Sequence, residues 1–463
     1  MKKAIYNCIK YKFHLLLCLL ILSGCEDFLE VEEPLGQINS IEVFEDETTA
    51  TAAVTTLYGK LRDEVLLTGK AEGLGVLMGI YSDEMIYYGF GGEPLDNFYK
   101  HQVFPDDLMV ENVWNTSYSL IYMCNAILEG LANSNALSDQ TKSQLQGETL
   151  FVRAITFVNL VELFGEIPFP TSSDYEENSR LSKISVPTVY ENIITDLTTA
   201  KTHLGTTSIS GERVRANKLA VAALLARTYL YTQQWEMAAS EASTVINHSA
   251  FNLEPDTEME FLKESSSAIL QFKPKFDGGN TEEASTYIFA SGPPPFVSLN
   301  PQLIETMEEG DLRKESWIGE VTDGNETWYY PNKYKFKTNT GTSMEYSIVL
   351  RLSEQYLIRA EAMAKLGNLP DALKDLNTIR HRAGLLDSET KTQNDILNAI
   401  YIERYHELFS EFGHRWFDLK RLGLAKEILA PIKPGWKPTD IRLPIPENEL
   451  LMNPNLNPQN PGY

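Results

Sequence analysis

The sequence predicts a mostly α-helical fold of paired helices, interrupted by a large irregular insertion that carries a few short strands. In the clearest pair, residues 351–380, apolar and small residues recur at helical spacing on both sides of a short break. Gly367-Asn368 stops the first helix and Pro370-Asp371 starts the second, as such residues commonly do. Residues 251–347, in contrast, show little sustained periodicity and contain several Gly, Pro and Asn turns.

Small residues lie where the two helices of this hairpin must touch. Ala360 and Ala372 are short enough for an antiparallel pair to cross closely, and the spacing resembles that of a tetratricopeptide unit. A second copy lies 134 residues earlier, and six of its seven aligned positions keep an apolar or small residue. We therefore predict a tetratricopeptide-like scaffold of about four units, with the later hairpin at residues 348–382. The aligned positions of the earlier copy are Ala226, Tyr229, Thr232, Trp235, Ala238, Ala242 and Val245.

The first 24 residues have the pattern of a bacterial secretory signal peptide. Lysines precede an apolar run from Phe13 to Leu22, which is far shorter than the ~20 residues that a membrane-spanning helix needs. Leu22-Ser23-Gly24-Cys25 resembles the lipobox, in which the Cys becomes the lipidated first residue. We therefore expect residues 1–24 to be a lipoprotein signal peptide and the lipid on Cys25 to be the only membrane attachment. Ordinary cleavage beside a coincidental Cys is the alternative.

Cysteine content and charge limit the possible crosslinks and ligands. Cys8 and Cys18 leave with the signal peptide and Cys25 takes the lipid, so only Cys124 remains and no intramolecular disulfide is expected. The chain has 64 acidic and 40 basic residues, a formal charge of −24. Such a surface repels nucleic acid and polyanionic ligands, which leaves neutral or cationic ligands.

The same periodicity predicts further helices along the chain. The first spans residues 46–66, where Asp46 can cap the first turn, and residues 73–92 then break the pattern. Within the insertion, we predict strands at Ala268–Phe272 and Tyr287–Phe289, as parts of an ordered mixed subdomain. The later helical segments are residues 109–131, 141–164, 187–204, a hairpin at 215–248, and 395–412.

Two segments carry many aromatic side chains outside the helical stripes. Six aromatics lie between Tyr81 and Tyr99, and five lie between Trp328 and Phe336. An aromatic ring packs against the apolar C–H face of a sugar, while Asn, Asp, Gln or Arg bonds to the sugar hydroxyls. Core packing is the alternative for each ring. The candidate ligand-binding residues are Tyr87, Tyr88, Phe90, Asn97, Phe296, Trp317 and Trp328.

The sequence lacks the common catalytic motifs. It contains no GxSxG nucleophile elbow, no GxxxxGK[ST] phosphate loop and no HExxH zinc helix. His406-Glu407 comes nearest, but Ser410 stands where the second zinc-binding His is required. We therefore predict a protein that is not an enzyme, with no catalytic residues, no metal and no cofactor; a surface glycosidase or a pure scaffold is the alternative. Ion pairs are expected instead for the charged residues of this region, Glu403, Arg404, Glu407 and Arg415.

Four runs in the C-terminal part carry a resemblance to a known family. They are RLSEQYLIRAEAMAKLGN from Arg351, LNTIRHRAGL, ERYHELFSEFGHRWFDLKRLG from Glu403, and the final LPIPENELLMNPNLNPQNPGY. With the lipobox, these runs make the chain similar to the SusD/RagB family of surface lipoproteins in Bacteroidetes. The resemblance implies an N-terminal SusD-like helical region at 25–250 and a C-terminal SusD/RagB region at 251–463. It also implies that the variable segments, 81–99 and 251–347, help to form a ligand face.

The resemblance further implies a role in nutrient uptake. Members of the family are anchored by lipid in the cell outer membrane, facing the exterior, where they capture oligosaccharides or, in some cases, peptides. They close as a lid over a SusC-like TonB-dependent transporter. We therefore expect an oligosaccharide ligand, with a peptide as the alternative, and a transporter partner.

Overall fold

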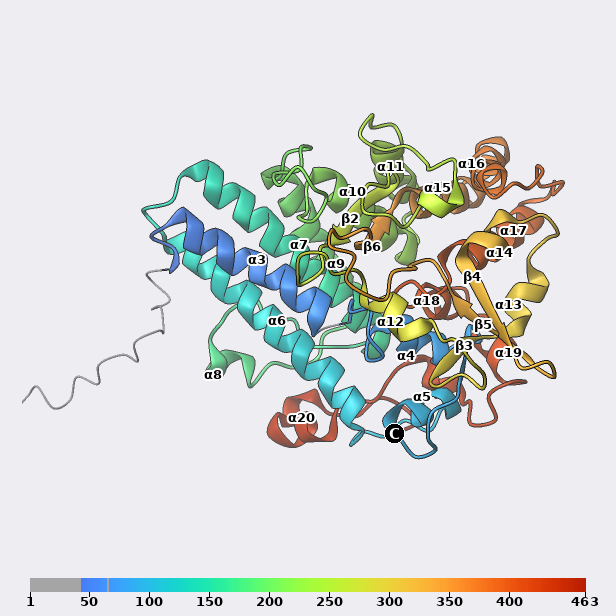
Figure 1. Ribbon diagram of the computed structural model, residues 1–463. Helices are drawn as coiled ribbons and strands as arrows, with labels where there is room; N and C mark the ends of the chain where they lie inside the picture. The colour runs from blue at the N-terminus through green and yellow to red at the C-terminus, as the bar shows by residue number, and fades with distance from the viewer. Residues whose placement is uncertain (1–42, 65) are drawn as a thin grey trace, which may run out of the picture. The chain divides into compact units, whose positions relative to one another are not determined.

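The computed structural model describes residues 43–64 and 66–463 of the chain. The predicted signal peptide and the predicted lipidation at Cys25 lie outside these residues. The fold is mostly α-helical with a few short strands, which confirms the predicted fold class (Figure 1). No helix in the described part is long and apolar enough to cross a membrane.

The scaffold is made of long helices: α3 (Glu47–Asp63), α6 (Leu108–Asn133), α7 (Asp139–Phe164), α9 (Val186–His203), α10 (Lys218–Tyr231), α11 (Trp235–Ile246), α15 (Leu352–Lys365), α16 (Leu369–Arg382) and α17 (Gln393–Leu408). From α6 to α11, each helix packs against the next one in this series. α11 then packs against α15, which contacts both α16 and α17. Helices from before and after the insertion are thereby stacked into one array.

Side-chain caps fix where several of these helices begin. The Asp46 carboxylate accepts the backbone N–H groups of Thr48 and Thr49 at 2.9 and 3.1 Å, which confirms the predicted cap of α3. Ser138 caps α7 and Asn217 caps α10 in the same way. Each cap satisfies backbone donors that have no partner within the helix, so the start of the helix is stabilised.

The core of the later hairpin contains the small residues that the sequence singles out. Ala360 of α15 and Ala372 of α16 are fully buried in one cluster with Leu376 and Ile379. Ala226, Ala238, Ala242 and Val245 of the earlier hairpin α10–α11 are also fully buried. The two predicted hairpins are therefore confirmed, and the contact of α11 with α15 places them side by side although 100 residues separate them in sequence.

The insertion pairs with strands that lie outside it. Strands β1 (Met85–Tyr87), β3 (Val297–Leu299), β5 (Thr327–Pro331) and β4 (Ile318–Thr322) form an antiparallel sheet in that order. β2 (Ala268–Phe272) pairs with β6 (Ser347–Arg351), which leads directly into α15. The insertion is ordered and mixed, as predicted, but it is not self-contained, because β1 comes from the N-terminal half. The domain division at residue 250 stays a prediction.

Three predicted elements differ from the structure. Residues 73–92 contain α4 (Leu74–Tyr81), which has no amphipathic pattern because all eight of its residues are buried. The strand predicted at Tyr287–Phe289 is instead the end of helix α12 (Glu282–Tyr287) and the coil after it, whereas β2 forms as predicted. The last predicted helix ends at Leu408 instead of residue 412, since Ser410 and Phe412 have positive φ angles of 60° and 39°.

Short elements complete the described chain: α5 (Pro94–Lys100), α8 (Tyr175–Asn178), η2 (Thr257–Met259), α13 (Pro301–Thr306), α14 (Leu312–Trp317), α18 (His414–Arg421), α19 (Ala425–Leu429), η3 (Pro438–Ile441), α20 (Glu447–Met452) and η4 (Pro454–Leu456). Cys124 is a free, buried thiol.

Candidate ligand-binding surface

The pairing of β1 with β3 brings together two aromatic segments that are about 200 residues apart in sequence. Tyr87 lies opposite Val297, and beyond this pair the Tyr88 N–H donates to the Phe296 carbonyl at 2.7 Å. The rings of Tyr87 and Phe296 meet edge to face, with centroids 5.7 Å apart. Tyr88 and Phe296 are both partly exposed, so the end of this strand pair presents aromatic side chains to solvent.

The loop after β1 holds Phe90 out into solvent. Phe90 is 82% exposed. The Gly92 N–H and the Lys100 ammonium both donate to the Asp96 carboxylate, at 2.9 and 2.6 Å, and thereby tie the loop to α5. The Tyr87 hydroxyl donates to Glu93 at 2.9 Å, and burial, followed by this bond, raises the pKa of Tyr87 to about 12. Phe90 is therefore exposed on a loop that hydrogen bonds hold to β1 through Tyr87 and to α5 through Asp96.

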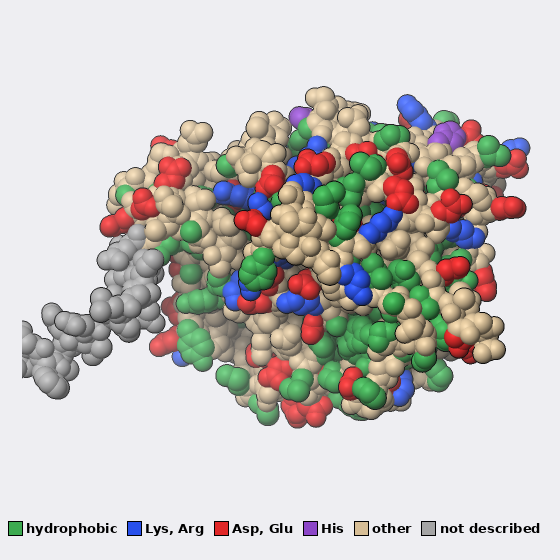
Figure 2. Space-filling model, viewed as in Figure 1, with side chains coloured by type: hydrophobic (Ala, Val, Ile, Leu, Met, Phe, Trp, Pro, Cys, Tyr) green, Lys and Arg blue, Asp and Glu red, His purple; other side chains and the backbone are tan. Residues whose placement is uncertain are grey.

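Prolines extend this surface on the side of the insertion. Pro293 and Pro295 are exposed and lie three residues and one residue before Phe296. We call Tyr88, Phe90, Pro293, Pro295 and Phe296 the aromatic platform. In Figure 2, hydrophobic side chains gather over the part of the surface where α12, β3 and α5 lie in Figure 1. A rigid apolar surface of this kind matches the flat C–H face of a sugar ring.

Trp328 supports the platform without forming part of its exposed surface. It lies in β5 and is 7% exposed. A Cβ atom at Gly292 would lie 1.9 Å from the Trp328 ring, so only glycine allows this loop to cross the indole so closely. The indole thus fixes the loop that carries the prolines.

Two other candidates have structural partners. The Asn97 amide donates to the Asp107 carboxylate at 3.1 Å, and Asp107 also caps α6, so Asn97 links α5 to α6. Trp317 was predicted to lie outside the helical stripes, and in the structure it is the last residue of the short helix α14. It is 1% exposed, and its indole N–H donates to the Thr257 carbonyl at 2.9 Å. Trp317 therefore lies in the core, apart from the platform.

The structure adds residues that are not among the candidates from the sequence. Tyr99 of α5 is partly exposed, and its ring contacts that of Tyr87, with centroids 6.4 Å apart. The Lys433 ammonium lies 3.8 Å from the centre of the Tyr99 ring, and burial lowers the pKa of Lys433 to about 7. Lys433 is distant in sequence and carries no local motif, so only the fold reveals this contact. The Gly-Pro-Pro-Pro run before Phe296 was the visible signal for Pro293 and Pro295.

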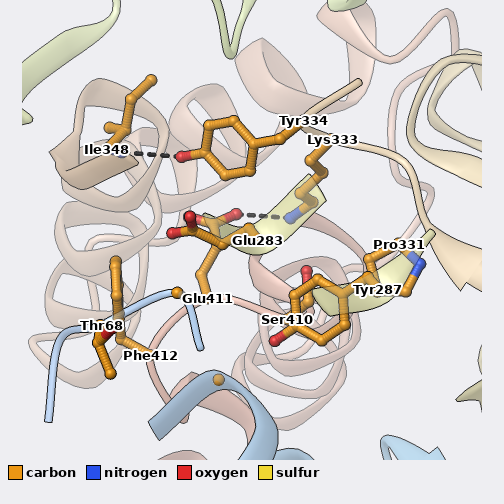
Figure 3. Close-up of a pocket in the computed structure, with 12 residues that line it drawn as sticks. Thr68, Glu283, Tyr287, Pro331, Lys333, Tyr334, Ile348, Ser410, Glu411 and Phe412 are labelled. Atoms are coloured by element: carbon orange, nitrogen blue, oxygen red, sulfur yellow. Dashed lines mark hydrogen bonds and ion pairs between the residues drawn. The ribbon is translucent and has the colours of Figure 1, made fainter. Parts of the chain in front are cut away.

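A small cavity lies between β5, α12 and the loop after α17, and Figure 3 shows the side chains that line it. Lys333 points toward Glu411 and donates to it at 2.5 Å, and the Tyr334 hydroxyl accepts the Ile348 N–H at 2.8 Å (Figure 3). The cavity volume is about 10 Å³, which is enough for about one water molecule. A sugar ring does not fit into this space.

The charged residues around His406 form ion pairs, as the sequence predicts. Arg313 donates to Glu403 at 2.6 Å and to Glu407 at 2.9 Å. The other two predicted residues also pair, Arg404 with Asp418 at 2.7 Å and Arg415 with Asp83 at 2.6 Å. Burial, reinforced by Arg313, lowers the pKa of His406 to about 3. Within residues 43–64 and 66–463, no group of three His, Cys, Asp or Glu side chains is arranged to hold a metal ion.

Comparisons with known proteins agree with this architecture. A SusD-family model matches residues 275–463, and a second model, described as starch-binding and associating with the outer membrane, matches residues 85–230. SusD-like protein P2 of Formosa agariphila is 29% identical over 98% of this chain and 100% of its own length. SusD-like protein P25 of the same organism is 24% identical over 98% of each chain.

Solved structures share the fold. A laminarin-binding SusD-like protein superposes with a TM-score of 0.78 at 24% identity, over 90% of this chain and 100% of that one. Surface glycan-binding protein A from Bacteroides thetaiotaomicron gives a TM-score of 0.76 at 20% identity, over 91% and 100% of the two chains. Together, the two family models span well over half of the sequence, including most of the insertion. The chain belongs to the SusD/RagB family.

Proposed function

We propose that this protein captures a nutrient oligosaccharide on the aromatic platform and delivers it to a SusC-like TonB-dependent transporter in the outer membrane. The observation that carries the proposal is the pairing of β1 with β3, which brings Tyr88 beside Phe296, two residues before the exposed Phe90. The lipobox at Cys25 supports lipid anchoring, and the outer-membrane association that the family description names supports a place at the cell surface.

A neutral glycan suits this surface better than a charged ligand. The rings provide apolar contact, and the net charge of −24 disfavours polyanions. The family description names starch and one structural relative binds laminarin, both of which are neutral glucans. We therefore place the ligand among neutral glucans or chemically similar oligosaccharides.

Binding without catalysis agrees with the chemistry around the platform. Glycoside hydrolysis needs two carboxyl groups that flank the scissile bond, one of them free to donate a proton. Here Glu93 accepts the Tyr87 hydroxyl, and Asp96 accepts Lys100 and the Gly92 N–H. These carboxylates serve to brace the loop that carries Phe90.

Calorimetry with the detergent-solubilised mature protein tests the proposal. The titrants are maltoheptaose (α-1,4-linked), laminariheptaose (β-1,3-linked) and a pool of neutral peptides. We expect one of the sugars to bind, and Phe90→Ala to weaken binding by on the order of 1 to 3 kcal/mol, as for loss of one stacking ring. Because Phe90 is 82% exposed, the melting temperature should stay unchanged.

Tyr122 provides the matched control. It is 51% exposed on α6 and is not part of the platform, so Tyr122→Ala should leave binding unchanged. Wild-type affinity in Phe90→Ala, Tyr88→Ala and Phe296→Ala alike would contradict the platform as the binding site. Binding of the peptides alone would contradict the sugar assignment.

A further inference from the structure

Two hollows lie side by side along α17, and neither is lined by a residue of the aromatic platform. Their volumes are about 430 and 760 Å³. They share Asn398, Tyr401 and Leu424 as lining residues, so they meet along one face of the helix. We call the combined hollow the α17 trench. Helices α13, α17 and α19, which contribute to it, lie on the right of Figure 1.

The floor of the trench is a regular stripe on α17. Asn394, Asn398, Tyr401 and Tyr405 follow one another at intervals of four, three and four residues, which places them on one face of the helix. Tyr401 and Tyr405 are about 6 Å apart along the axis, because an α-helix rises about 1.5 Å per residue. Trp235, at the start of α11, adds an indole to the first hollow.

Many polar groups of the trench have no partner within the protein. Among the described residues, the amides of Asn394, Asn398 and Gln302 and the hydroxyls of Tyr401 and Tyr405 make no side-chain hydrogen bond with the protein. The carboxylates of the platform loop, in contrast, are all bonded within the protein. The trench therefore offers both donors and acceptors to a ligand that carries many hydroxyls.

Formal charges cancel within the trench. Its lining contains three acidic side chains, Asp83, Glu361 and Glu427, and three basic ones, Lys365, Arg415 and Arg421. Four of these form two ion pairs: Arg421 binds Glu361 at 2.6 and 2.8 Å, and Arg415 binds Asp83 at 2.8 and 2.6 Å. In a chain of net charge −24, this balance favours a neutral ligand over an ionic one.

We propose that the α17 trench is a second binding site, which takes a neutral oligosaccharide chain along the stripe from Asn394 to Tyr405. Tyr401 and Trp235 supply aromatic contact and the unpaired amides supply hydrogen bonds, which is the combination that sugar recognition needs. The Tyr405 ring packs against the Arg415 guanidinium, 3.9 Å from the ring centre. The site does not depend on the platform, because the two share no residue. A polysaccharide that reaches both sites gains avidity over one that reaches a single site.

The test uses the mature protein with the platform weakened by Phe90→Ala, Tyr88→Ala and Phe296→Ala together. Maltoheptaose and laminariheptaose are titrated into this triple variant by calorimetry. We expect residual binding of at least one sugar, which Tyr401→Ala weakens about tenfold, as loss of one stacking ring does. Asn398 is exposed, so Asn398→Arg fills the trench without disturbing the core and should remove the residual binding. Tyr122→Ala, in the same background, should have no effect.

Three outcomes overturn the inference. The first is that neither sugar binds the triple variant, and the second is that binding survives Asn398→Arg and Tyr401→Ala unchanged in proteins that melt at the parental temperature. The third is that the triple variant binds only neutral peptides, which would leave a trench with a different ligand class. If the trench variants lose sugar binding while the platform variants bind with wild-type affinity, the result would support the trench and contradict the platform proposal.

Discussion

At the scale of single residues, burial decides what each candidate side chain does. Phe90 is exposed as its Gly-rich surroundings indicate, because glycines on both sides leave few neighbours to cover it. Trp317 looked equally free in sequence, yet it is covered by Phe261 and bonded to Thr257, which lie more than 50 residues away. No local sequence pattern predicts contacts with residues so far away in the chain. The sequence thus indicates which residue types suit a sugar, and the fold decides which of them reach the surface.

Glu84 gives a prediction at this scale. It is 3% exposed, and burial raises its pKa to about 7. The Ser410 N–H, which donates to the carboxylate at 2.8 Å, lowers the pKa but does not outweigh burial. Because the folded-state pKa lies above that of the unfolded chain, the protonated carboxyl favours the folded state. This contribution is complete below about pH 4.5 and is lost as the pH rises through about 7.

Glu84→Gln should therefore stabilise the protein at pH 8 by roughly 1 to 3 kcal/mol, since an amide mimics the neutral carboxyl at every pH. The gain should disappear near pH 5. Chemical unfolding at the two pH values measures the difference in the free energy of unfolding. Glu72→Gln, a substitution at an exposed position, is the control. An equal effect at both pH values would show that the titration of Glu84 is not the cause.

At the scale of elements, the periodicity of apolar residues was sufficient to predict the helical hairpins but not the sheet. α15 and α16 are predictable because their buried faces recur every three to four residues. α4 was missed, since a helix buried on all sides has no such face. The pairing of β1 with β3 was also invisible, because short strands separated by about 200 residues have no sequence signal for each other.

The close crossing of α15 and α16 gives a prediction for an element. Ala360 is fully buried where the two helices meet, so Ala360→Leu must displace packed neighbours. Overpacking of this kind costs about 1 to 3 kcal/mol and should lower the melting temperature by several degrees. Ala52→Leu, on the exposed face of α3, is the matched control and should melt like the wild type. Equal melting of both variants would show that the crossing tolerates a larger side chain.

At the scale of the whole molecule, the two halves of the sequence depend on each other. α11 packs against α15 across the insertion, β1 completes the sheet of the insertion, and Arg415 pairs with Asp83. The family resemblance indicated this architecture from the C-terminal motifs, but the positions of the loops that form the aromatic platform follow from contacts between the halves. The platform is therefore a product of the assembled fold.

The proposed anchoring also concerns the whole molecule. Cys25→Ser should leave a folded protein without its lipid, since none of the helices in residues 43–64 and 66–463 can span a membrane. Membrane fractionation of cells that lack the transporter partner measures this. The variant is expected in the soluble fraction, and recovery in the outer membrane would contradict a lipid anchor at Cys25.

A crystal structure of the mature protein with the heptasaccharide that binds in calorimetry tests the central claim most directly. We predict sugar rings packed on Phe90 and Phe296, with adjacent hydroxyls near Tyr88, and little movement of the loop that Asp96 and Glu93 brace. If the protein is saturated with the sugar and the sugar lies elsewhere, with the platform empty and open to solvent, the structure would contradict the account.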